Sequence, residues 1–94
     1  MNLDKSIKRI AKRVKKGFQG YPQIELEYFG ETSSCATQVT VKFILEEDAE
    51  AQEEKFSGEN DVRKDQSIQT TLLKIIERTN AKTVTEIEGV SLIK

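Results

Sequence analysis

The chain has 94 residues, of which 36 % are hydrophobic and 33 % are charged, and its formal net charge is −1. That length suits one domain with a modest core, so we expect a single domain over residues 1–94. The single cysteine, Cys35, excludes an internal disulfide, and the longest apolar run, Phe43–Leu45, is far too short to span a membrane.

Residues 3–18 predict an amphipathic helix, because hydrophobic residues recur there at the spacing of one helical face. The predicted inner face comprises Leu3, Ile7, Ile10, Ala11, Val14 and Phe18. The opposite side carries seven basic residues: Lys5, Lys8, Arg9, Lys12, Arg13, Lys15 and Lys16. With Asp4 they give residues 1–20 a net charge of +6, whereas the other residues, eight basic and fifteen acidic, carry −7. Such asymmetry indicates interaction with a charged partner or with another part of the same chain.

After a turn at Gly20–Pro22, two segments alternate hydrophobic and polar residues in the manner of half-buried strands. In residues 23–30 the inward positions are Ile24, Leu26 and Tyr28. In residues 36–45 the inward positions are Val39, Val41, Phe43 and Leu45. A short polar loop joins the two segments, so we expect them to pair as an antiparallel hairpin.

Residues 46–54 contain six acidic residues and no basic one: Glu46, Glu47, Asp48, Glu50, Glu53 and Glu54. The pattern leaves open whether this acidic run is a solvated loop, a short helix or the entry to a third, edge strand that ends near Phe56. Asn60 or Asp61 can then cap a second amphipathic helix that ends at Thr79–Asn80. Its apolar stripe comprises Ile68, Leu72, Leu73, Ile75 and Ile76, with Val62 at the margin.

Residues 82–93 are rich in valine, isoleucine and threonine and predict a last strand. The inward positions change parity near Gly89, which predicts a β-bulge at Glu88–Gly89. The whole pattern reads α-β-β-(β)-α-β. We therefore predict an α+β fold in which two amphipathic helices pack on one face of a small, mainly antiparallel sheet of three or four strands.

Most catalytic and metal chemistry lacks the residues that it needs in this chain. Without histidine there is neither the commonest general base nor the commonest metal ligand, and the five scattered glycines form no phosphate-binding loop. The acidic run lacks the residue order and the glycine of a calcium-binding loop. Cys35 fits a small hydrophobic residue at a strand entry better than an activated thiolate. We therefore predict no catalytic residue, no metal site and no cofactor.

Three interpretations of the basic helix face remain open. Its outward cations could form a sequence-independent site for the RNA or DNA backbone. Alternatively, the acidic run, with a charge of −6, could neutralise the basic helix, either across one molecule or in a second copy of the chain. In the third interpretation the lysines only keep a small domain soluble.

The order of elements over residues 3–78, with Arg63 and Lys64 opening the second helix after Gly58, resembles that of a double-stranded-RNA-binding domain. The resemblance implies phosphate contacts at the start of that helix. In that family the helix is rich in alanine, whereas here it carries Ile68, Thr70, Thr71, Leu72 and Leu73. The predicted third strand is also strongly acidic beside the expected phosphate track. We therefore do not assign the chain to this family.

The balance of charge favours a protein partner, because a dedicated phosphate binder more often has a basic isoelectric point than one of about 5.5. We predict a non-catalytic binding or regulatory module that associates with a protein or with a second copy of itself, with nucleic acid as the alternative and no membrane partner. The predicted binding face comprises Lys5, Lys8, Arg9, Lys12, Arg13 and Lys16, and the acidic run is its counter-surface. No signal-peptide core follows the charged start, so we expect a cytoplasmic location.

Overall fold

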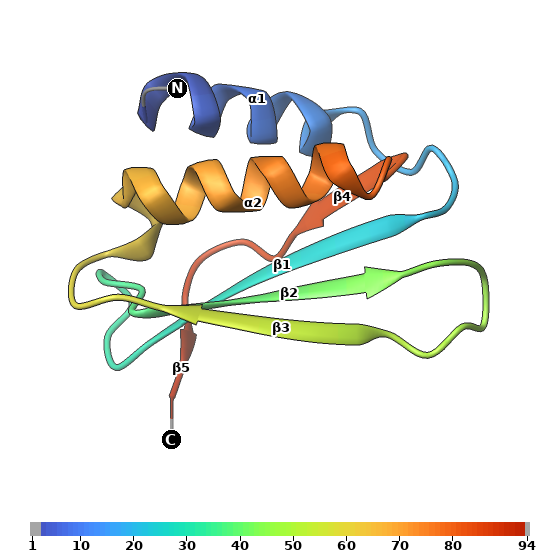
Figure 1. Ribbon diagram of the computed structural model, residues 1–94. Helices are drawn as coiled ribbons and strands as arrows, with labels where there is room; N and C mark the ends of the chain where they lie inside the picture. The colour runs from blue at the N-terminus through green and yellow to red at the C-terminus, as the bar shows by residue number, and fades with distance from the viewer. Residues whose placement is uncertain (1–2, 94) are drawn as a thin grey trace.

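The computed structural model describes residues 3–93, in which two helices lie on one side of a five-stranded mixed sheet (Figure 1). The elements in chain order are α1 (Leu3–Lys15), β1 (Gln23–Gly30), β2 (Gln38–Ile44), β3 (Gln52–Ser57), the 3₁₀ helix η1 (Val62–Lys64), α2 (Gln66–Arg78), β4 (Thr83–Glu86) and β5 (Ser91–Leu92). The α+β class and the element order predicted from the sequence are confirmed.

The sheet has the strand order β3-β2-β1-β4, and β5 continues beside β1 after β4 ends. The hairpin of β1 and β2 is antiparallel, as predicted, and pairs Leu26 with Val41. Helix α2 then carries the chain from the β3 edge across to the opposite edge (Figure 1). This crossover makes β4 and β5 run parallel to β1. The sheet has five strands where three or four were predicted, and it is mainly antiparallel, as predicted, with β4 and β5 parallel to β1.

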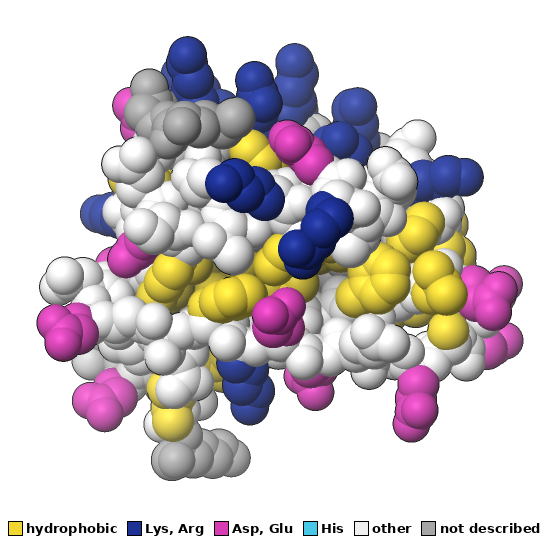
Figure 2. Space-filling model, viewed as in Figure 1, with side chains coloured by type: hydrophobic (Ala, Val, Ile, Leu, Met, Phe, Trp, Pro, Cys, Tyr) yellow, Lys and Arg dark blue, Asp and Glu magenta, His cyan; other side chains and the backbone are white. Residues whose placement is uncertain are grey.

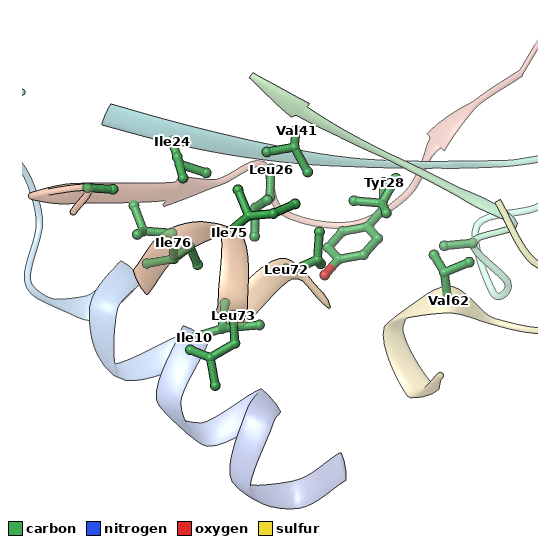
Figure 3. Packing of buried hydrophobic residues seen from close by; sticks show 14 residues of the cluster. Ile10, Ile24, Leu26, Tyr28, Val41, Val62, Leu72, Leu73, Ile75 and Ile76 are labelled. Carbon is green, nitrogen blue, oxygen red and sulfur yellow. The ribbon is translucent and has the colours of Figure 1, made fainter. Parts of the chain in front are cut away.

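The core lies between the inner face of the sheet and α2 (Figure 3). Ile24 and Leu26 of β1 are fully buried and point toward α2, where Leu72 and Ile76 are also buried. The alternation predicted for β1 is confirmed, because Ile24, Leu26 and Tyr28 are buried whereas the acidic residues between them are only half-buried. Full burial of a leucine or isoleucine side chain contributes about 1.5–3 kcal/mol, so this layer supplies much of the stability.

Helix α1 packs against α2 and β4 through a narrow contact. Ile10 and Ser6 are its buried residues, and Ser6 Oγ lies 3.1 Å from Thr70 Oγ1 of α2. The predicted inner stripe is wrong at Ala11 and Phe18, which are exposed. The helix ends at Lys15 because Gly17 takes a left-handed conformation (φ 72°), which turns the chain away from the helix axis. The Phe18 ring instead lies edge-on to Tyr21, with 5.4 Å between ring centroids.

The acidic run combines a loop with an edge strand. Residues 45–51 connect β2 to β3, and Gln52–Ser57 pair antiparallel with β2. Of the three alternatives for this segment, the third strand ending near Phe56 is therefore the one adopted. Leu45 was predicted to point inward but is 59 % exposed, because β2 ends one residue earlier, at Ile44.

The second predicted helix is divided into two short pieces, each with its own aspartate cap. The Asp61 side chain accepts a hydrogen bond from the Arg63 backbone N–H and starts η1. Asp65 has an extended backbone that ends η1, and its side chain caps α2 at the Ile68 N–H. Val62, the first residue of η1, is completely buried, which corrects its predicted marginal position. The predicted end at Thr79–Asn80 is confirmed.

The C-terminal segment is two short strands in place of one bulged strand. Gly89 has a left-handed backbone (φ 77°), and the chain leaves the sheet between Glu86 and Ser91. Val84 and Val90 face the core, whereas Ile87 and Leu92 are exposed. The change of parity in the sequence thus corresponds to a four-residue connection between β4 and β5, residues 87–90. This connection is larger than the bulge expected at Glu88–Gly89.

Replacing Gly30 by alanine should destabilise the fold. A Cβ at this position would overlap the backbone carbonyl of Cys35, where the loop between β1 and β2 folds back on the strand. Because a backbone group must shift to make room, we expect the free energy of unfolding to fall by about 2 kcal/mol or more. Urea unfolding followed by circular dichroism measures the change. Ser33→Ala, in the exposed part of the same loop, is the control, and equal stability of the two variants would contradict the prediction.

Candidate functional site

The basic residues of α1 lie on its outer side, away from the core. Figure 2 shows Lys and Arg side chains gathered along this edge of the molecule, over α1. Of the six predicted binding residues, five are exposed and Arg13 is half-buried: Lys5, Lys8, Arg9, Lys12 and Lys16 are the exposed ones. Lys16 stands just beyond the last residue of the helix. The structure therefore brings the six predicted cations onto one surface, called here the basic face.

Two arginines join the basic face to the end of α2. Arg13 Nη1 donates a hydrogen bond to the Ala81 carbonyl oxygen at 3.3 Å. Arg9 Nη1 lies 3.8 Å from Glu77 Oε1, with both side chains more than half exposed. An exposed pair of this kind contributes about 0–1 kcal/mol, so it orients Arg9 without neutralising the whole face.

A groove runs between α1 and α2 beneath these arginines. Its α1 side is formed by Arg9, Lys12, Arg13 and Lys16, its α2 side by Leu73 and Glu77, and its volume is about 200 Å³. A wider hollow of about 530 Å³ shares Arg13, Lys16 and Glu77 and adds Gln19 and Lys82. Sequence reasoning missed Lys82 and Glu77, because only the tertiary packing of α2 against α1 brings them to this place.

The acidic run does not lie on the basic face. Four of its six acidic residues are in the loop of residues 45–51, and Glu53 and Glu54 are in β3. Strand β3 is the edge of the sheet opposite β4, whereas α1 packs beside β4 (Figure 1). The acidic run therefore does not neutralise the basic helix of its own molecule. Only a second molecule can bring the two surfaces together.

The other basic pair singled out in the sequence, Arg63 and Lys64, lies in η1. Arg63 is held by Asp61, with Nη2 2.7 Å from Oδ2 and Nε 3.0 Å from Oδ1, and Nη2 also donates to the Ser34 carbonyl oxygen at 3.2 Å. The side-chain hydrogen bond from Arg63 lowers the pKa of Asp61 below its ordinary value. The same contact raises the pKa of Arg63. The Arg63 side chain therefore stabilises the turn at η1, in which Val62 is buried.

A second cleft, of about 300 Å³, opens between α1, η1 and the end of β4 and includes Tyr28, Arg63 and Glu86. Desolvation raises the pKa of Glu86, and the charge of Arg63 partly offsets the rise. Burial also raises the pKa of Tyr28, whose hydroxyl accepts a hydrogen bond from Gln69 Nε2 at 3.1 Å. Gln69 Nε2 donates as well to the Val62 carbonyl at 3.0 Å. The Gln69 hydrogen bonds satisfy polar groups in the core, and burial is the main cause of both raised pKa values.

Several findings bear on the other sequence expectations. Cys35 is half-buried in the loop that covers Gly30. Within residues 3–93, no three side chains of histidine, cysteine, aspartate or glutamate come close enough to share a metal ion. Neither helix in that range is long and apolar enough to cross a membrane.

No protein-family model, curated protein or solved structure matches the chain.

Asp61→Asn should remove a pH-dependent part of the stability while keeping the cap, because asparagine can still accept from the Arg63 N–H. In the folded state the pKa of Asp61 lies below its ordinary value of 3.8. Its contribution is therefore complete above about pH 5 and is lost progressively as the pH falls through the lowered value. We expect the variant to be less stable at pH 7 by up to about 1 kcal/mol.

Urea unfolding of the wild type and of Asp61→Asn at a series of pH values from neutral to acid tests this expectation. The difference in unfolding free energy should shrink toward zero in acid, and a difference that stays constant would contradict the assignment. Glu59→Gln, at an exposed position in the preceding turn, is the matched control for loss of one negative charge.

Proposed function

We propose that this chain is a small, non-catalytic binding module that docks on an acidic protein surface through the basic face of α1. One observation carries the proposal. The cations of α1 point outward from a helix that is fixed to the core, while the acidic run of the same molecule lies at the opposite edge of the sheet.

The attachment of α1 makes the basic face a preformed surface. Ile10 is buried in the core, the Ser6–Thr70 contact ties the helix to α2, and the Arg13–Ala81 hydrogen bond ties it to the segment between α2 and β4. A partner that binds the outer side therefore does not have to order the helix first, which lowers the entropic cost of association. The charges would act mainly on the rate of encounter and on orientation, and their effect would weaken as salt is added.

A second copy of the chain offers one acidic surface of the required kind. Its acidic run is exposed in the loop and at the start of β3. Contact of a basic face with the acidic run of another molecule joins two different surfaces, so it would build chains or rings rather than a closed pair. A distinct acidic protein would occupy the same face in a simple complex.

Nucleic acid is the alternative occupant, and the uninterrupted series of cations in residues 5–16 favours it. One feature of the surroundings speaks for protein instead. Arg63, at the place where the double-stranded-RNA-binding family implies phosphate contacts, is already held by Asp61.

Removing two cations from the basic face should weaken binding to an acidic peptide. The variant is Lys8→Gln with Lys12→Gln, and the matched control, Lys55→Gln with Lys64→Gln, removes the same charge from exposed positions elsewhere. Fluorescence anisotropy with a labelled peptide of residues 46–54 measures the affinity at low and moderate salt. We expect a loss of about five- to tenfold at low salt for the first variant only, since each exposed contact contributes up to about 1 kcal/mol.

The same titration with short single- and double-stranded RNA and DNA separates the two candidates. Tight binding of a nucleic acid at moderate salt, lost in the Lys8→Gln, Lys12→Gln variant, would replace the protein partner by the phosphate backbone. Failure of the wild type to bind the acidic peptide even at low salt would overturn the proposal. An equal loss in both double variants would show that only total charge matters and would overturn the assignment to α1.

A further inference from the structure

An apolar groove lies on the other side of α2 from the basic face. Its volume is about 320 Å³, and it is lined by Val41, Phe43, Gln52, Glu53, Glu54, Ile75, Arg78 and Thr79. Figure 2 shows hydrophobic side chains exposed in a band between α2 and the hairpin of β2 and β3. The proposed function does not use this groove.

The fold itself leaves this band uncovered. Helix α1 packs beside β4 and so covers the far side of α2, whereas nothing in residues 3–93 packs over the β3 edge. Phe43, Phe56 and Ile68 are consequently only partly buried, although all three contact the core. Apolar bands of this kind, bordered by charged residues, are typical of protein–protein interfaces.

The two borders of the groove have opposite charge. On the α2 border stands Arg78, and Lys74, one helical turn earlier, is exposed on the same side of the helix. On the strand border stand Glu53 and Glu54 of β3. Glu54 pairs with Val41 in the sheet register, so its side chain points to the same side of the sheet as α2.

We propose that this groove is the interface of a symmetric homodimer. A two-fold axis that runs along the groove exchanges its two borders when a second copy faces it. Arg78 of each copy then opposes Glu54 of the other, and the apolar floors around Phe43 and Ile75 meet. In this one orientation the charges of the groove are complementary to those of the same groove in a second copy. We therefore assign a second copy of the chain as its occupant.

The same residues oppose a simpler mode of pairing. Strand β3 is an edge strand, so its outer backbone groups could accept another strand. In an antiparallel β3–β3 pair, Glu54 lies opposite Gln52, Glu54 or Phe56 of the other strand, depending on the register. The first register places Glu53 opposite Glu53, the second places Glu54 opposite Glu54, and the third leaves a charge opposite an apolar ring. Contact through the side chains of α2 and β3 avoids this conflict, and we assign the interface to the groove rather than to the strand edge.

Dimerisation through the groove leaves the basic face of α1 outward in both copies, because α1 lies on the opposite side of α2. The dimer would present two basic faces to an acidic partner. Two linked contacts of low affinity can bind a repetitive partner far more tightly than one, without any new interaction. This interface is independent of the proposed function, since it uses none of the α1 cations.

Sedimentation equilibrium of the wild-type chain over about 5–500 µM, together with two single variants and their mixture, tests the interface. Arg78→Glu and Glu54→Arg each place like charges across the two-fold axis, so each should weaken dimerisation by about tenfold or more. In a mixed pair, the new acidic side chain at position 78 of one copy meets the new basic side chain at position 54 of the other. The second contact of that pair keeps the wild-type residues, Glu54 and Arg78. The mixture should therefore recover dimers that neither variant forms alone.

Lys64→Gln, which removes a cation from an exposed position outside both surfaces, is the matched control, and its dimerisation should equal that of the wild type. Circular dichroism of each variant verifies that it is folded, since Arg78 and Glu54 are exposed. A wild type that stays monomeric over the whole range would overturn the proposal. Dimers that survive Arg78→Glu but disappear in the Lys8→Gln, Lys12→Gln variant would assign self-association to α1 and would also overturn it. Acidic-peptide binding is measured separately, so either proposal can fail alone.

Discussion

The burial of one face of α2 on the centre of the sheet is the interaction on which the other features depend. Ile24 and Leu26 of β1 and Leu72 and Ile76 of α2 are each fully or nearly fully buried. Because α2 crosses from the β3 edge to the β4 edge, this packing also fixes the parallel direction of β4 and β5. It leaves a strip of the sheet uncovered on one side of the helix and a place for α1 on the other. Both candidate surfaces follow from where one helix lies on five strands.

Much of the fold could be predicted because the two periodicities are clean. The alternation in residues 23–30 and the helical spacing around Leu72 and Ile76 correspond directly to buried positions. The errors occur where a local backbone conformation interrupts a period. Gly17 ends α1 before Phe18 can join its stripe, and the extended backbone of Asp65 divides the second helix. A hydrophobic pattern says which residues are apolar, but it does not show where the chain turns.

The candidate site was only partly predictable for a different reason. The outward cations of α1 could be placed from the helical period, because residues opposite a buried stripe face solvent. Glu77 and Lys82, which line the same groove system, come from the other end of the chain. The groove beside β3 gave no sequence signal, because Phe43 and Ile75 resemble ordinary core residues. The partial exposure of Phe43 results from the absence of a covering element over that edge in the described structure, which is a property of the whole topology.

The narrow attachment of α1 has a consequence for the order in which the molecule loses structure. Ile10 is the one apolar side chain of this helix that is fully buried, whereas α2 buries four. Local opening costs least where the least apolar area is exposed to water, so we expect α1 to detach on warming before α2 and the central strands. Its amide protons exchange with solvent sooner than those of β1. A ligand on its outer side that also contacts α2 would slow that exchange. The exchange rate of the α1 amides would then indicate whether the ligand is bound.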